Sequence, residues 1–332
     1  MNNCSARDAM KPSLRIKVRL AAIALVAAAP AFAQPYPAKP VRLIVPFPAG
    51  GGSDVVGRLV AQKLSERTGQ QVFVDNRAGA GGSIGTEVAV KSPPDGYTTV
   101  LASTSEVGIN PALYKLTYDP VRDLTPVVLV GATPMVILVH PSLPVKTLKD
   151  VVALAKAKPG ELNVASAGNG TITHLSGEMF RSQVGAKWTH VPYKGAPPAL
   201  TDLASGQVQV MFSSLPAAMA FLRANRIKPL AVSSQKRAPA LPDTPTAAEA
   251  GIGGYDVEYW YGLFVPAAVT KDVVARLHDE TTQVLRQPDF VSNLASQGAT
   301  TGALTQAQFA DFVKSESGKW GQVVRASGAK AD

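Results

Sequence analysis

The sequence predicts an α/β protein with two lobes, each built on a doubly wound sheet, joined by two crossover strands. Short apolar runs alternate with helical patterns along almost the whole chain of 332 residues, as in α/β folds. Two long extended segments, at 130–139 and 257–266, bracket the second series of these units. The length also suits two domains, since single domains centre near roughly 100–150 residues. One large doubly wound sheet is the alternative arrangement.

The N-terminus has the pattern of a secretory signal peptide over residues 1–33. A basic segment precedes the apolar run 20–29, and Ala31-Phe32-Ala33 fits the cleavage pattern, so the mature chain is expected to start at Gln34. The apolar run is shorter than the roughly 20 residues that a membrane-spanning helix needs. Met10 is an alternative start that would shorten the signal. These features predict export from the cytoplasm.

Composition excludes several classes of protein. The chain has 33 Lys and Arg against 24 Asp and Glu, for a net charge of +9. Outside residues 1–33 the basic excess is mild and spread out, and its longest cluster is Lys236-Arg237, so no nucleic-acid or membrane patch is expected. The single cysteine, Cys4, precedes the apolar run of the signal. The mature chain is therefore expected to have no disulfide, thiol catalysis or thiolate metal site.

The elements of the first lobe follow from apolar spacing and turn residues. The helix at 54–67 has apolar residues at Val56, Val60 and Leu64 and is closed by Gly69, as expected for one buried face and a glycine stop. The helix at 83–91 is stopped by a pair of prolines. Strands are expected at 41–47, 71–74 and 98–102.

The second series follows by the same criteria. Strands are expected at 162–165, 190–192, 208–212 and 229–232, and helices at 148–158, 196–204 and 215–223. A further helix is expected to open from the loop 166–171 and to run to Val184. The strand at 259–266 then precedes helices at 271–285, 291–295 and 306–324. These assignments place a signal peptide at 1–33, lobe one at 34–132 plus 260–332, and lobe two at 133–259.

The most informative motif is a glycine-rich turn between the first strand and the first helix. It reads Pro46-Phe47-Pro48-Ala49-Gly50-Gly51-Gly52-Ser53-Asp54. Such a turn places free backbone N–H groups and the positive end of a helix dipole at one point, which attracts carboxylates and phosphates. Asp54 is expected to cap the helix.

Four further loops also lie at the carboxyl ends of predicted strands. In open α/β sheets ligands bind in the crevice outside these ends. The loops carry small residues and hydroxyl groups and only one lysine, which favours anion capture by helix N-termini, hydroxyls and water. With the glycine-rich turn, the set is 48–54, 103–105, 166–171, 193–195 and 213–214.

Motifs for enzymatic chemistry are incomplete. Gly81-Gly82-Ser83-Ile84-Gly85 matches the nucleophile elbow of α/β hydrolases, but a loop separates Ser83 from the preceding strand. The glycine turns match neither a Walker loop nor the full dinucleotide fingerprint. His174 and Glu178 are spaced for one helix face but lack the second histidine of zinc proteases. No cofactor or metal is predicted, and a secreted hydrolase using Ser83 is the enzyme alternative.

Several motifs together resemble the Bug (TctC-type) periplasmic solute-binding proteins of tripartite tricarboxylate transporters. The resemblance runs in order over essentially the whole mature chain. Besides the opening, which runs from Tyr36 to Asp54, its motifs are Val74-Asp75-Asn76-Arg77-Ala78-Gly79-Ala80-Gly81-Gly82, Pro94-Asp95-Gly96-Tyr97, Gly170-Thr171, His174-Leu175, Gly177-Glu178, Val191-Pro192-Tyr193-Lys194-Gly195 and Leu241-Pro242-Asp243-Thr244-Pro245-Thr246.

The resemblance implies a type II-like two-lobe binding protein, not an enzyme, that closes on a small organic carboxylate. A monomer that docks on membrane transporter subunits is expected; a ligand sensor docking on a receptor is the alternative. Ser213 stands where the family often has aspartate, which disfavours an amino-acid ligand. The predicted ligand-binding residues are Pro48, Ala49, Gly50, Gly51, Ser53, Asp54, Ser103, Thr104, Ala165, Ser166, Gly170, Thr171, His174, Tyr193, Gly195 and Ser213.

Overall fold

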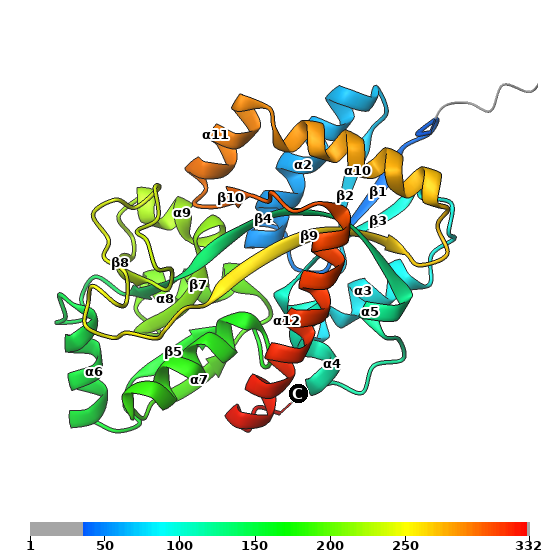
Figure 1. Ribbon diagram of the computed structural model, residues 1–332. Helices are drawn as coiled ribbons and strands as arrows, with labels where there is room; N and C mark the ends of the chain where they lie inside the picture. Colours follow the sequence, from blue (N-terminus) through cyan, green and yellow to red (C-terminus); the bar gives the residue numbers. More distant parts are fainter. Residues whose placement is uncertain (1–35, 331–332) are drawn as a thin grey trace, which may run out of the picture. The chain divides into compact units, whose positions relative to one another are not determined.

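The strands of this protein form one mixed sheet in a computed structural model that describes residues 36–330 (Figure 1). The predicted signal peptide, its cleavage site and Gln34 lie outside the described residues. The strand order is β2-β1-β3-β9-β4-β7-β5-β6, and β8 and β10 also pair with β4. The strands are β1 (Val41–Val45), β2 (Val72–Asn76), β3 (Thr98–Ser103), β4 (Leu124–Val139), β5 (Asn163–Ser166), β6 (Thr189–Pro192), β7 (Val210–Ser214), β8 (Lys228–Val232), β9 (Glu258–Pro266) and β10 (Thr300–Thr301).

Strand β4 belongs to both ends of this sheet. Its residues 124–134 pair antiparallel with β9, and its residues 135–139 pair antiparallel with β7 and β8. We call β1, β2, β3, β9, β10 and the 124–134 part of β4 the first half, and the remaining strands with the 135–139 part of β4 the second half. Figure 1 shows β4 and β9 side by side through the centre of the fold.

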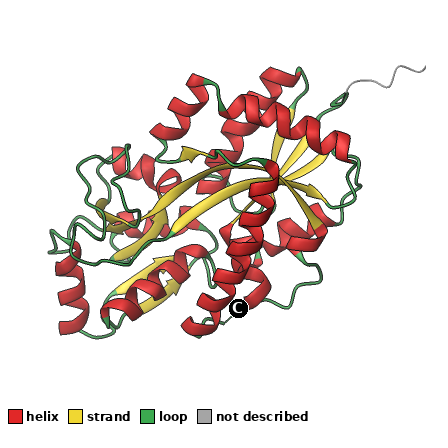
Figure 2. Cartoon of the chain, in the orientation of Figure 1, coloured by secondary structure: helices red, strands yellow, loops and turns green. Residues whose placement is uncertain are grey.

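The predicted α/β class with two long crossover segments is therefore confirmed, with one difference. The two doubly wound sheets are continuous, because β4 starts at Leu124 rather than near residue 130 and is shared between them. The return segment, β9, pairs with β3 and β4 and so completes the first half. Parallel strands flanked by helices form the outer part of each half, β2-β1-β3 and β7-β5-β6 (Figure 2), whereas β8 and β10 pair antiparallel with β4.

The predicted helices lie close to their expected positions. They are α2 (Gly52–Thr68), α3 (Ser83–Val90), α6 (Leu148–Ala157), α7 (Ile172–Val184), α8 (Ala196–Ser205), α9 (Leu215–Arg223), α10 (Lys271–Leu285), α11 (Pro288–Ser296) and α12 (Gln306–Ser327). Helix α2 ends where Gly69 adopts the left-handed conformation, with φ of 69°, which glycine enters at no steric cost. None of the helices described within residues 36–330 is both long and apolar enough to span a bilayer.

The segment between β3 and β4 contains helical turns that the sequence reading left out. Here the chain forms a π-helical turn, η2 (Thr104–Ile109), followed by α4 (Asn110–Leu113) and α5 (Pro120–Asp123). A short turn, η1 (Ala80–Gly82), lies earlier, between β2 and α3. Turn η2 is fully buried and packs against α12, which crosses the first half in Figure 1. Its capping pair is Ser103 and Glu106.

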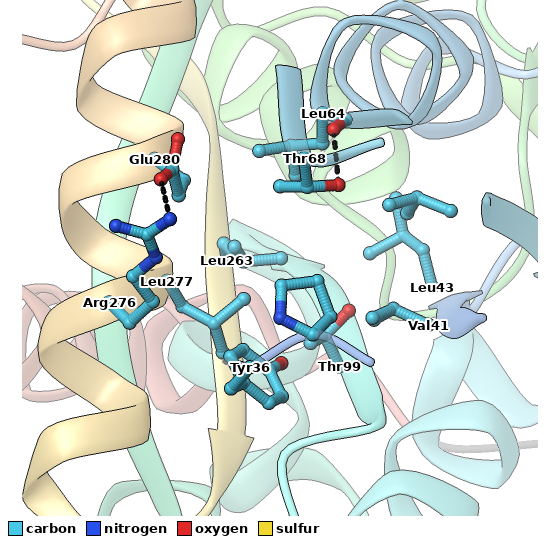
Figure 3. Close-up of a pocket in the computed structure, with 12 residues that line it drawn as sticks. Tyr36, Val41, Leu43, Leu64, Thr68, Thr99, Leu263, Arg276, Leu277 and Glu280 are labelled. Atoms are coloured by element: carbon cyan, nitrogen blue, oxygen red, sulfur yellow. Dashed lines mark hydrogen bonds and ion pairs between the residues drawn. The ribbon is translucent and has the colours of Figure 1, made fainter. Parts of the chain in front are cut away.

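A small cavity lies in the core of the first half, between β1, α2, β9 and α10 (Figure 3). Its lining is mainly aliphatic, and it holds about 20 Å³, room for about one water molecule. At its edge Arg276 pairs with Glu280 at 2.7 Å, and Arg67 pairs with the same carboxylate. We interpret it as a packing void rather than a ligand site, because it is enclosed by core strands and presents few polar groups.

Candidate functional site

A second cavity lies where the two halves of the sheet meet. It holds about 20 Å³. The first half contributes the start of α2, the start of η2 and Tyr259 of β9, and the second half contributes the starts of α7 and α8 and the end of β7. Its lining residues are Phe47, Pro48, Gly51, Gly52, Ser53, Ser105, Ala167, Thr171, Ile172, Thr173, Ala196, Ser214 and Tyr259.

Four helices begin at this cavity. Gly51, Thr171, Gly195 and Ser214 are the N-cap residues of α2, α7, α8 and α9, and none of them forms a side-chain cap. The first backbone N–H groups of a helix have no partner within the helix and carry a partial positive charge. The cavity therefore receives positive potential from two helices of at least three turns, α2 and α7, and from two shorter ones.

Hydroxyl groups supply most of the polar lining. Ser53 Oγ lies 3.2 Å from Tyr259 Oη, and the Oγ1 atoms of Thr171 and Thr173 lie 2.8 Å apart. Ser105 and Ser214 complete the set, and none of the described lining residues carries a charge. Hydroxyl donors beside helix starts, without a competing acid or base, suit the binding of a carboxylate or another small anion.

The cavity adjoins a larger hollow that holds about 390 Å³. The two share Phe47, Pro48 and Ala167. The hollow is lined further by the glycine-rich segment 78–82 and by residues 168–169 and 193–195. Lys194 is the charged member of this described lining. The hollow is therefore adjacent to the hydroxyl-lined cavity, on the side of Phe47, Pro48 and Ala167.

The structure brings six of the sixteen predicted ligand-binding residues to these two spaces. Pro48, Gly51, Ser53 and Thr171 line the cavity, and Pro48, Tyr193 and Gly195 line the hollow. The other ten line neither space. They are Ala49, Gly50, Asp54, Ser103, Thr104, Ala165, Ser166, Gly170, His174 and Ser213.

Asp54 organises the glycine-rich turn from beneath. The N-cap of α2 is Gly51, so the expectation that Asp54 itself caps the helix is wrong. Its carboxylate accepts hydrogen bonds from Gly50 N, Arg58 Nε and Asn76 Nδ2, each at 2.9 Å. Burial raises the pKa of Asp54, but the bonds from these three donors and the charge of Arg58 outweigh it and hold the pKa below its ordinary value.

His174 and Ser166 support the loop before α7. His174 Nδ1 accepts a hydrogen bond from Gly170 N at 3.1 Å, and the ring stacks on His190 with centroids 4.0 Å apart. His190 Nε2 is in turn hydrogen-bonded to Ser166 Oγ at 2.7 Å. Within residues 36–330, no group of three or more potential ligands is placed to hold a metal.

Several lining residues that the prediction missed, such as Ser105 and Ser214, directly follow residues that it named. Ser214 lines the cavity, while Ser213 is buried in β7. Thr104 Oγ1 accepts a hydrogen bond from Trp260 N, and Ser105 faces the cavity. The alternation of side chains along a strand could have separated Ser213 from Ser214 if the strand face had been known. The sequence signal for Tyr259 is the aromatic cluster Tyr255, Tyr259, Trp260 and Tyr261, which fits a cleft wall and core packing equally well.

Ser83 is not arranged as a nucleophile. It begins α3 after the turn η1, and its Oγ donates to the backbone oxygen of Ala80 at 2.5 Å. No histidine or carboxylate within the described chain is hydrogen-bonded to this hydroxyl. Nucleophilic serines need such a base within hydrogen-bond reach.

Comparisons with known proteins agree with this architecture. The sequence profile of the family described as "Tripartite tricarboxylate transporter family receptor", TctC, matches residues 56–329. Protein BugT of Bordetella pertussis is 38% identical over 306 residues, which are 91% of this chain and 94% of BugT.

Solved periplasmic binding proteins superpose with TM-scores up to 0.86. The structure described as "R. palustris Rpa4515 with adipate" is 35% identical with a TM-score of 0.86. The match covers 89% of this chain and 99% of the adipate-bound chain. MatC from Rhodopseudomonas palustris with bound malate is 32% identical with a TM-score of 0.82, covering 87% and 100%. This chain therefore belongs to the TctC family of periplasmic solute-binding proteins.

Proposed function

We propose that this protein captures a small organic carboxylate in the hydroxyl-lined cavity and delivers it to a tripartite tricarboxylate-type transporter. The observation that carries the proposal is the convergence of four helix starts and six hydroxyl side chains on one cavity without a charged lining residue. Relatives with adipate and with malate support the class of ligand.

In this proposal the two halves act as lobes that close on the ligand. The lobe boundaries follow the prediction, 34–132 plus 260–332 and 133–259, and the change of partner along β4 between residues 134 and 135 supports them. The cavity has room for about one water, so a dicarboxylate enters when the lobes part or extends into the adjoining hollow. Residues 1–33 would direct the protein to the periplasm, where it would work as a monomer.

The binding residues in this proposal divide into two groups. The first group contacts the carboxylate directly or through water. It consists of the backbone of 51–53 and the hydroxyl groups of Ser53, Ser105, Thr171, Thr173, Ser214 and Tyr259. The second group holds these contacts in place and consists of Asp54, Ser103, Thr104, Ser166, Gly170, His174 and Ser213. In the adjoining hollow, Tyr193 and Gly195 face the rest of the ligand. No covalent step is required of any of them.

A thermal-shift panel tests the proposal. The mature chain is melted with adipate, malate and related acids, with amino acids and neutral sugars as controls. A ligand at about 100 times its Kd adds about 2.7 kcal/mol to the free energy of unfolding, which raises Tm by several degrees. Ser53→Ala removes one lining hydroxyl and should reduce the shift, whereas exposed Ser315→Ala on α12 should not. Absence of a shift with every acid, before and after refolding from denaturant, would refute the proposal.

A further inference from the structure

A buried carboxyl group stands directly behind the cavity. Glu106, in η2, is fully buried. Its Oε2 accepts hydrogen bonds from Ser103 N at 2.9 Å and from Ser103 Oγ, while its Oε1 has no hydrogen-bond partner. None of the ion pairs among residues 36–330 includes Glu106. An isolated carboxylate is costly in such a place, so the group favours its neutral form.

A chain of hydroxyl groups connects Glu106 to the cavity. Ser103 Oγ lies 3.2 Å from Tyr259 Oη, and Tyr259 Oη lies 3.2 Å from Ser53 Oγ. Tyr259 and Ser53 both line the cavity. The relay therefore runs from Glu106 through Ser103 and Tyr259 to Ser53, where a bound carboxylate would sit.

The protonation state of Glu106 decides which way these hydroxyls donate. Ser103 Oγ has one proton and two lone pairs, and one lone pair accepts from Ser105 N at 3.3 Å. When Glu106 is ionised, Ser103 Oγ must donate its proton to the hydrogen bond with the carboxylate. The remaining lone pair of Ser103 Oγ then accepts a hydrogen bond from the hydroxyl of Tyr259. When Glu106 is protonated it donates to Ser103, Ser103 donates to Tyr259, and the proton of Tyr259 is free to point into the cavity.

A carboxylate ligand only accepts hydrogen bonds, so it favours the arrangement with more donors in the cavity. We propose that Glu106 is a positioning residue that takes up a proton when the cavity binds a carboxylate, and so turns the hydroxyls of Tyr259 and Ser53 toward the ligand. The proposal rests on the proposed function, and it adds that the bound carboxylate and one proton bind together. By linkage, affinity then falls as pH rises above the pKa of Glu106 in the ligand-free protein.

Glu106 is the carboxyl group that is hydrogen-bonded to the relay. Glu258, at the start of β9, also has a raised pKa because of burial and the nearby charges of Asp256 and Glu316, but it lies outside the relay. Burial raises the pKa of Glu106 to about 7, although hydrogen bonds from Ser103 oppose the shift. Burial also raises the pKa of its tyrosine neighbours Tyr259 and Tyr261 on β9 and of Tyr118 before α5. The charged groups on other elements packed against η2 have their own partners: Glu316 with Lys319 on α12, Arg122 with Asp123 on α5, and Glu178 with Arg181 on α7. His174 on α7 bonds Gly170, and β3, η1 and α4 carry no titratable side chain.

Calorimetry with adipate and with malate tests the coupling. Titrations at pH 6 and pH 8 in buffers of different ionisation enthalpy count the protons taken up. The wild-type protein should take up almost none at pH 6 and close to one at pH 8, and Kd should rise about tenfold per pH unit above pH 8. Glu106→Gln should bind without this uptake, and exposed Glu161→Gln should behave as wild type.

Tyr259→Phe tests the relay separately, because it leaves Glu106 in place. This variant should lose most of the proton uptake. In wild type and in Tyr259→Phe, the infrared band of a buried carboxylic acid should be present at pH 6 without ligand and should weaken toward pH 8. In Glu106→Gln this band should be missing. Binding with equal uptake in wild type and Glu106→Gln, unchanged uptake in Tyr259→Phe, or no such infrared band would overturn the proposal. Failure of every acid to bind would instead overturn the proposed function, and the coupling with it.

Discussion

Two buried carboxyl groups near the cavity show how the surroundings of a residue set its charge. Asp54 receives hydrogen bonds from a backbone N–H, an amide and a guanidinium group, and its pKa is lowered. Glu106 receives hydrogen bonds from Ser103 alone, and burial raises its pKa to about 7. One carboxyl group is therefore a fixed anion that holds the glycine-rich turn, and the other can gain or lose a proton in the physiological range.

The raised pKa of Glu106 makes the stability of the ligand-free protein depend on pH. Between its ordinary value of 4.5 and about 7, the folded state keeps a proton that the unfolded state has released. The free energy of unfolding should therefore fall as pH rises through this window, by about 3 kcal/mol in all. Urea denaturation of wild type and Glu106→Gln from pH 4.5 to 8 measures the difference; parallel profiles for the two proteins would contradict it.

The elements around the cavity explain what the sequence could predict and what it could not. Strands and helices were predictable because apolar spacing and glycine or proline stops agree along most of the chain, as at α2 and Gly69. Turn η2 was not, since its six buried residues have no helical period and depend on packing under α12. The loops of the site were predictable from strand ends, but which of two neighbours, such as Ser213 or Ser214, faces the cavity depends on the strand's orientation.

The close approach of α2 and α9 requires a glycine at position 52. A Cβ there would overlap Ser214 Oγ and lie 2.9 Å from Tyr261 Oη. Gly52→Ala should therefore push the two helix starts apart, destabilise the fold by about 1–3 kcal/mol and raise Kd for the carboxylate at least about tenfold. These effects are measured by denaturation and calorimetry.

A matched glycine on α12 provides the control. Gly318 is exposed within the helix and a Cβ there would meet nothing within 4 Å. Gly318→Ala should stabilise the protein by about 0.5–1 kcal/mol, as alanine does in helices, and leave Kd unchanged. Equal affinity of the two alanine variants would show that the contact at Gly52 does not shape the site.

At the scale of the whole molecule, both halves contribute to one cavity, and hydrogen bonds already cross between them. Ile172 N donates to Ser105 Oγ at 3.2 Å, and Tyr114 Oη donates to Asn169 O at 3.2 Å. The first bond joins η2, after β3, to the first residue of α7, and the second joins the segment after α4 to the loop before α7. A ligand held between the halves should strengthen this contact.

Hydrogen exchange measures that effect. Saturating adipate or malate should slow exchange at the start of α2 and in η2, which lie in the first half, and at the starts of α7 and α9, which lie in the second. The strands of the sheet centre, β4 and β9, are buried without ligand and should change little. Protection confined to one half would contradict closure of the two halves on the ligand.

The position of β9 has a consequence for how the chain is made. In the sheet this strand lies between β3 and β4, although it follows them by more than a hundred residues in sequence. The first half therefore cannot complete its sheet until Pro266 has left the ribosome. Until then the edges of β3 and of the 124–134 part of β4 that β9 will cover have no partner strand, and an open strand edge is a template for pairing with another chain.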